Sequence, residues 1–250
     1  MTINKFFWPS KLIAIVTLLV AATTQAATSN PQDPYENYNR HAYKLNDTLD
    51  RVAFKPVASA YNTVMPWPAK KGISNFFSNL NMIPTVANDI LQGNVLYTFS
   101  DSWRFLINST IGLLGFVDVA SAMNLPPHSE DLGLTLAKWG FKQSNYLILP
   151  IFGPSTVRDA IAFPVDYEVL SVYPYIDSKP LRYSLVSLNF VSKRAQLLDF
   201  ENVIQQASFD PYVFQRNAYL QRRNYLIQQN EGNDDTDSYI EEDSSAPAKK

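Results

Sequence analysis

The sequence contains no cysteine, which excludes disulfide bonds, thiol catalysis, cysteine-ligated metals and anchoring through an acylated cysteine. It has only two histidines, His41 and His128, too few for a histidine-rich metal site, and we predict no metal and no cofactor. Basic and acidic residues nearly balance, at 21 against 23, so the net charge indicates no nucleic-acid partner. Glycine is also scarce, with 8 residues against 16 prolines, and we expect prolines to separate the structural elements.

The sequence motifs of common hydrolases are absent too. No glycine-rich loop ends in Lys-Ser or Lys-Thr, which argues against nucleotide hydrolysis, and no G-x-S-x-G elbow occurs. The segment "PHSED" places His128 and Ser129 beside two acids, which raises the alternative of a soluble periplasmic hydrolase. Because the members of a catalytic triad converge from separate elements, we interpret this segment as a loop whose acids cap the next helix. We therefore predict no catalytic residues and no enzymatic activity.

The first 26 residues have the composition of a signal peptide. Lys5 and Lys11 accompany the apolar stretch "LIAIVTLLVAA", and the small residues of "TQA" precede Ala27. An uncleaved membrane anchor is the alternative, but the stretch is short for a membrane span. We expect residues 1–26 to be cleaved after export, leaving one domain over residues 27–230.

The end of the chain differs in composition from the rest. Residues 231–250 carry seven acids and two lysines, and they hold a single aromatic residue. Polar, acidic segments of this kind cannot bury enough apolar surface to fold alone. We predict a disordered, solvated tail.

Apolar residues recur at helical spacing through most of the domain. Two dipeptides, Asp33-Pro34 and Asp210-Pro211, each join a capping residue to a proline suited to the first helical position. We expect helices over about 38–52, 73–80, 83–91, 182–207 and 211–230. The run "NYLILPIF" predicts a hairpin or short helices, because prolines flank or interrupt it. The predicted fold class is mostly α, a single domain of short helices broken by prolines.

One apolar stretch, "RFLINSTIGLLGFVDVASAM", has about the length that crosses a bilayer. It begins at Arg104, and from Phe105 to Met123 its only charged residue is Asp118. Polar residues and glycines interrupt it, so it could be a buried core helix, a span, or a helix lying in the membrane boundary. Helices rich in Phe, Trp and Tyr favour that boundary, whereas periodicity alone favours a well-filled helical core.

Eight motifs in order resemble the MlaA/VacJ family, the outer-membrane component of the maintenance-of-lipid-asymmetry system of Gram-negative bacteria. They cover about residues 33–225. The motifs are "DPYENYNRHAYKLNDTLD", "KPVASAYNTVMP", "GISNFFSNL", "NDILQGN", "RFLINSTIGLLGFVDVAS", "EDLGLTLAKWG", "LPIFGPSTVRD" and "RAQLLD".

The resemblance implies a ring-like helical protein in the inner leaflet of the outer membrane, facing the periplasm. Its amphipathic channel would let stray phospholipid pass from the outer leaflet to a soluble periplasmic carrier of the Mla type. It also implies association with a trimeric porin. A periplasmic structural adaptor that binds porins is the alternative to lipid transport.

Two departures from the family pattern bear on the mechanism. The family commonly carries a lipobox cysteine after its signal peptide, and this chain has no cysteine, so amphipathic helices would have to hold it in the membrane. The family hairpin usually has Gly-Pro before its tyrosine, whereas Ser144-Asn145 precede Tyr146 here. This change predicts a stiffer gate.

We assign candidate site residues from residue type and motif position. Those expected to contact lipid or line the channel are Asn108, Ser109, Thr110, Gly112, Gly115, Asp118, Lys179 and Arg182. The expected gate hairpin comprises Tyr146, Leu147, Ile148, Leu149 and Pro150. The expected carrier-docking helix carries Arg216, Arg222 and Arg223, for which a solvated helix face or a surface for anionic lipid headgroups is the alternative.

Overall fold

A computed structural model describes residues 30–207 and 209–244, so the predicted signal peptide lies outside the described residues. The elements, in chain order, are α2 (Glu36–Leu49), the π-helical turn η1 (Asp50–Phe54), α3 (Lys55–Val64), α4 (Trp67–Gln92), α5 (Val95–Thr110), α6 (Val119–Ala122), α7 (Leu132–Lys138), β1 (Tyr146–Leu149), β2 (Gly153–Thr156), α8 (Val157–Val165), the π-helical turn η2 (Asp166–Leu170), the 3-10 turn η3 (Tyr173–Tyr175), α9 (Lys179–Ala207) and α10 (Pro211–Ser244).

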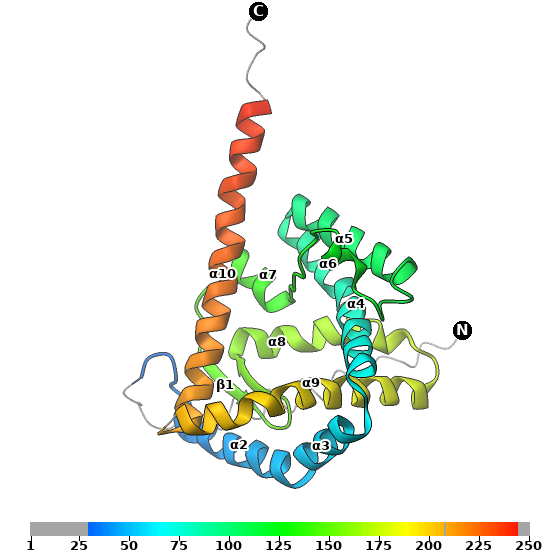
Figure 1. The fold of residues 1–250 in the computed structure, drawn as a ribbon. Coiled ribbons are helices and arrows are strands. Elements are labelled where there is room, and N and C mark those ends of the chain that lie inside the picture. Colours follow the sequence, from blue (N-terminus) through cyan, green and yellow to red (C-terminus); the bar gives the residue numbers. More distant parts are fainter. Residues whose placement is uncertain (1–29, 208, 245–250) are drawn as a thin grey trace, which may run out of the picture.

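The helices and one two-stranded antiparallel sheet confirm the predicted mostly α class. In Figure 1, α2, α3, α4 and α10 follow the edge of the molecule, and α8 lies inside this outline. Helix α5 lies at the end opposite α2 and α3, and α10 extends well beyond the body. The arrangement places α5 and the loop that follows it at the periphery.

Helix α4 is longer than predicted, because Pro84 does not end it. The two expected segments 73–80 and 83–91 form the single helix α4, with Pro84 inside it. Polar side chains bond to the carbonyls around this proline: Thr85 donates to Asn81 O at 2.9 Å and Asn88 donates to Pro84 O at 2.9 Å. The helix ends at Gly93, whose φ of 70° is the left-handed conformation typical of a helix C-terminus.

The two Asp-Pro dipeptides have different roles. Asp210 caps α10 as predicted, because its carboxylate accepts from the backbone N–H groups of Tyr212 and Val213. The prediction for Asp33 was wrong, since α2 starts at Glu36 and no side chain caps it. Asp33 is fully buried and instead joins residues far away in the sequence.

Helix α10 also departs from the prediction at its end. It continues to Ser244, through most of the segment expected to be a disordered tail. No proline occurs between Pro211 and Pro247, so the sequence contains no strong helix breaker over this length. The remaining tail residues, 245–250, lie outside the described residues.

A small apolar core joins the hairpin to the two helices that flank it. Tyr146 and Ile148 of β1 are fully buried and pack with Ala42 of α2 and Tyr212 of α10. Asn39 of α2 acts as a strand partner, because its amide accepts from Ile148 N at 2.8 Å and donates to Tyr146 O at 3.1 Å. The hairpin is therefore fixed on α2 by hydrogen bonds between the Asn39 side chain and the main chain of β1, as well as by packing.

Candidate functional site

Helix α5 is apolar on the outside and polar on the inside. Phe99 and Trp103 are 64% and 57% exposed, whereas Asp101 and Arg104 are 0% and 2% exposed. Asn108, one turn beyond Arg104, is buried as well. A helix of a water-soluble protein has the opposite arrangement, with its apolar stripe facing the core.

The loop after α5 extends this exposed surface. We use the name α5 apolar surface for Val95, Leu96, Phe99, Trp103, Leu106, Ile111, Leu113, Leu114, Phe116 and Val117, all of them exposed. Contiguous apolar patches of this kind mark sites that contact another protein, a ligand or a membrane. Each such side chain would gain about 1.5–3 kcal/mol on leaving water completely.

Among residues 30–207 and 209–244, no helix combines the length and the hydropathy that crossing a membrane requires.

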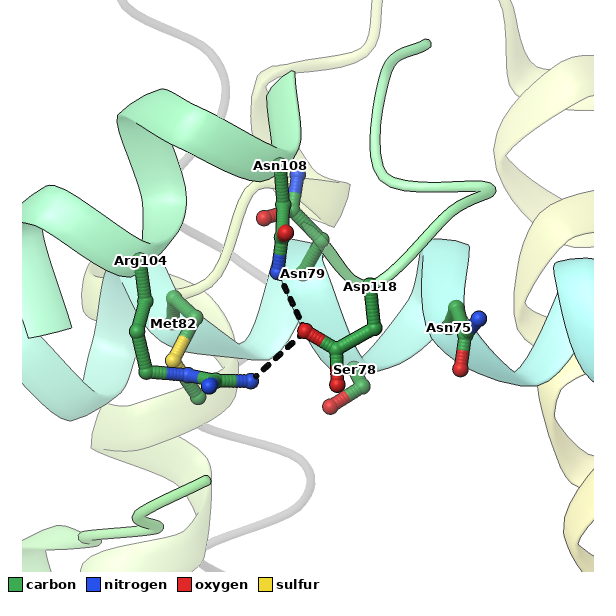
Figure 2. Close-up of a pocket in the computed structure, with 7 residues that line it drawn as sticks. All are labelled: Asn75, Ser78, Asn79, Met82, Arg104, Asn108 and Asp118. Atoms are coloured by element: carbon green, nitrogen blue, oxygen red, sulfur yellow. Dashed lines mark hydrogen bonds and ion pairs between the residues drawn. The ribbon is translucent and has the colours of Figure 1, made fainter. Parts of the chain in front are cut away.

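A small polar pocket lies behind the α5 apolar surface (Figure 2). Asp118 accepts from Asn108 Nδ2 at 3.0 Å and pairs with Arg104 Nη2 at 3.2 Å. Burial opposes the charge on Asp118, but hydrogen bonds from Ser121 and Asn108, with the nearby Arg104, lower its pKa. The α4 side of the pocket is formed by Asn75, Ser78, Asn79 and Met82.

The pocket brings together two of the predicted residues, Asn108 and Asp118, with five lining residues that the sequence analysis missed. Arg104 and Asn79 line it, and each has a buried atom without a hydrogen-bond partner, Nε of Arg104 and Oδ1 of Asn79. The spacing of Arg104 and Asn108, one turn apart on the same face as Asp101, could have identified Arg104.

Other predicted residues of this segment have structural contacts. Ser109 is half-buried and accepts a hydrogen bond from Asn79 at 2.9 Å, and the exposed Thr110 donates back to Leu106 O at 2.7 Å. A Cβ on Gly115 would stand 2.5 Å from the Cβ of Asn79. The glycine allows the loop to approach α4, rather than leaving an open position for lipid.

The two cationic residues predicted to contact lipid, Lys179 and Arg182, lie on α9. Lys179 is exposed in the first turn of α9. Arg182 is half-buried, donates to Pro174 O at 3.4 Å and lies 5.6 Å from the centre of the Tyr183 ring.

The sequence analysis missed a second group of cationic residues. Lys70 and Lys71 of α4 line an open pocket of about 240 Å³ between α3, α4 and α9, together with the exposed Trp67. Lys70 contacts the side chain of Asn62 at 3.2 Å. The adjacent lysines of "PWPAKKG" were the available sequence signal.

The expected gate hairpin is present, but most of it is packed inside the protein. Tyr146, Leu147 and Ile148 are buried, and Leu149 and Pro150 are half-buried. Asn46 of α2 bonds to both sides of the turn, donating to Leu149 O at 2.9 Å and accepting from Ile151 N at 2.7 Å. The side chains of Ile151 and Phe152, in the turn between β1 and β2, are exposed.

The arginines of α10 require a correction, because two of the three are buried. Arg216 pairs with Asp33 at 3.0 Å. Arg223 bonds to both carboxylate oxygens of Asp131, at 2.6 and 2.9 Å, and to Asp159 at 2.8 Å. These ion pairs fasten α10 to the body, so the two residues cannot form a docking surface, and only Arg222 is exposed.

One of the two acids of "PHSED", Asp131, caps the next helix as predicted, whereas Glu130 binds His128, Gln92 and Asn230 instead. Asp131 accepts from Leu134 N at 2.9 Å at the start of α7. Burial opposes its charge, but the hydrogen bonds and charge of Arg223 lower its pKa. The carboxylate therefore both caps α7 and binds α10.

Comparison with known proteins identifies a family and a fold. Residues 31–226 match a family model described as MlaA lipoprotein. The Escherichia coli (strain K12) protein named intermembrane phospholipid transport system lipoprotein MlaA is 34% identical over 226 residues, which are 87% of each chain. An uncharacterized protein of Rickettsia prowazekii (strain Madrid E) is 33% identical over 196 residues, 78% of each chain.

A solved structure shares the fold at a TM-score of 0.68 and 31% sequence identity. It is described as the structural basis for maintenance of bacterial outer membrane lipid asymmetry, and the match covers 78% of this chain and 98% of that one.

Proposed function

The chain belongs to the MlaA family, and we propose that it removes mislocalised phospholipid from the outer leaflet of the outer membrane. Removal would keep the two leaflets different in composition. The names of the Escherichia coli relative and of the solved structure support this proposal, since they refer to phospholipid transport and to lipid asymmetry. A soluble carrier of the Mla type would take the lipid onward, and a trimeric porin is the second proposed protein partner.

The single observation that carries the proposal is the reversed polarity of α5. A helix that exposes Phe99 and Trp103 while it buries Asp101 and Arg104 is suited to hydrocarbon on its outer side. Amphipathic helices lie in the boundary of one leaflet with the apolar face buried about 5–10 Å. We place the α5 apolar surface in the periplasmic leaflet of the outer membrane, without help from an acylated cysteine.

The polar pocket behind α5 gives the proposed path its polar side. Moving an unsolvated headgroup through hydrocarbon costs several kcal/mol, so a path must offer polar contacts to the head. Arg104, Asn108 and Asp118 supply such contacts, and the unpartnered atoms of Arg104 and Asn79 have hydrogen-bonding capacity left for a ligand. The lipid tails would remain against the α5 apolar surface.

We also propose roles for residues outside this pocket, and these roles rest on where the residues lie in the family motifs and in the fold. Lys179 and Arg182 are proposed phosphate contacts. The hairpin is a proposed gate whose movement is confined to the exposed part of the turn around Phe152, because β1 and Ile151 N are bonded to α2. Arg222 is the remaining proposed contact for the carrier. Transfer along this path would be passive, driven by the imbalance between the leaflets or by a distant ATPase.

A complementation experiment tests the proposal. Cells that lack this protein would receive the wild type, a Trp103→Glu/Leu106→Glu variant, or a Gln221→Glu control whose charge lies on an exposed part of α10. We expect the wild type and the control to remain in the outer-membrane fraction at high salt and to keep outer-leaflet phospholipid low. We expect the double variant to leave that fraction and to let outer-leaflet phospholipid rise.

The adaptor alternative gives a different result. It predicts that a porin copurifies with the wild type while outer-leaflet phospholipid is the same with and without the protein. That result would overturn the transport proposal.

A further inference from the structure

A buried cluster of ionisable side chains lies between α4, α5 and the loop before α7. Asp89 of α4 and Asp101 of α5 are both 0% exposed, and His128 of the loop is nearly buried between them. His128 Nδ1 lies 2.8 Å from Asp101 Oδ2 and 3.8 Å from Asp89 Oδ1. One potential ligand atom from each residue fits within 4.8 Å of the others.

Protein groups satisfy the carboxylates of this cluster only in part, because Asp101 Oδ2 pairs with His128 Nδ1 while three other oxygens have no hydrogen-bond partner. Neither oxygen of Asp89 has a hydrogen-bond partner, and Oδ1 of Asp101 has none either. A buried carboxylate without hydrogen bonds is costly, because desolvation of the group is not repaid. A third acid, Glu130, contacts the other side of the imidazole, so three carboxylates surround one histidine.

The geometry around His128 orients its ring. Nε2 lies 3.2 Å from Glu130 Oε1, and Glu130 is itself fixed by Gln92 Nε2 at 2.6 Å and Asn230 Nδ2 at 3.0 Å. Tyr97 stacks on the ring at 4.1 Å. With Glu130 accepting from Nε2, as carboxylates do for metal-ligating histidines, Nδ1 is the nitrogen that would bind a metal, in place of its 2.8 Å contact with Asp101.

We propose that Asp89, Asp101 and His128 form a binding site for a divalent first-row transition metal, with Glu130 orienting the histidine. One imidazole nitrogen and two carboxylates match Zn²⁺, which takes three or four such ligands, better than Ca²⁺, which takes six to eight oxygens. The ion would bind oxygens of Asp89 and Asp101 that have no hydrogen-bond partner in the protein, and its charge would compensate two carboxylates that share one histidine. The inference does not depend on the proposed lipid transport.

Such a site has a structural role. It would link α4, α5 and the loop before α7, directly behind the apolar helix that we place in the membrane. Our sequence prediction of no metal site is replaced by this proposal, because only folding brings Asp89 and Asp101 to His128.

Calorimetry on the chelator-treated, tag-free mature protein in detergent tests the site with Zn²⁺, Mn²⁺ and Ca²⁺. We expect one Zn²⁺ per chain, weaker binding of Mn²⁺, and still weaker binding of Ca²⁺. Asp89→Asn should weaken Zn²⁺ binding by more than about tenfold. Asp47→Asn, which removes the same charge from α2, should leave it unchanged.

A second measurement needs no variant. The sequence holds two histidines, and His41 is exposed on α2. In imidazole ¹⁵N NMR spectra of the wild type, one equivalent of Zn²⁺ should shift the Nδ1 resonance of His128 and leave His41 in place. The proposal is overturned if no resonance shifts, if both histidines respond alike, or if Asp89→Asn binds Zn²⁺ as the wild type does.

Discussion

Replacing Gly115 with alanine should separate the loop after α5 from α4. The φ of Gly115 is 93°, a conformation that costs an L-residue about 1–2 kcal/mol. The new Cβ would also stand 2.5 Å from the Cβ of Asn79, an atom that cannot rotate away, and overpacking of this kind costs about 1–3 kcal/mol. Loss of the hydrogen bond from Asn79 to Ser109 would add about 1 kcal/mol. We expect the free energy of unfolding to fall by about 4 kcal/mol.

Urea unfolding of the detergent-solubilised mature protein, followed by near-ultraviolet circular dichroism, measures this loss. Gly93→Ala is the matched control, because Gly93 has a φ of 70° and nothing within 4 Å of the new Cβ, so only the strain of about 1 kcal/mol applies. Asn79→Gly removes the blocking atom, and in the Gly115→Ala background it should recover part of the loss. Equal losses for Gly115→Ala and Gly93→Ala would refute the packing that we describe.

Three further predictions concern the polar interior. Arg223→Met should lower the free energy of unfolding by about 3–5 kcal/mol in the same urea experiment, because it leaves buried carboxylates unpaired, whereas the exposed Arg222→Met should change it little. The lowered pKa of Asp131 means that its ionised form stabilises the fold at neutral pH. This stabilisation is lost as the pH falls below 3.8, the ordinary pKa of an aspartate. Asp131→Asn should therefore flatten the acid side of a curve of unfolding free energy against pH. Asn39→Ala should cost about 2–3 kcal/mol and speed amide exchange in β1, measured by mass spectrometry, because Asn39 is the strand partner of Ile148.

Features set by neighbouring residues could be predicted from the sequence. Asp131 and Asp210 cap the helices that follow them, because a capping contact spans only two or three residues. Asp33 carries the same Asp-Pro signal but binds Asn39, Tyr212 and Arg216 instead. Partners up to 183 residues away leave no local pattern, so this role could not be read from the chain.

The orientation of α5 could not be predicted for a different reason. A periodic apolar stripe has the same spacing whether it faces a core or a membrane, so the sequence alone left both alternatives open. The decisive fact is which side is covered, and that depends on α4 packing against Arg104 and Asn108. Arg223 shows the same limit: its spacing on a basic helix face predicts a surface for a partner, but Asp131 and Asp159 of distant segments cover it.

The central claim is that the α5 apolar surface faces hydrocarbon, and the fluorescence of Trp103 tests it most directly. A variant with Trp67→Phe and Trp139→Phe leaves Trp103 as the only tryptophan of the mature chain. It would be reconstituted in vesicles whose lipids carry bromine at different depths. We predict strongest quenching by bromines about 5–10 Å below the headgroups and almost none by aqueous iodide. Quenching by iodide without quenching by bromolipid would contradict the account.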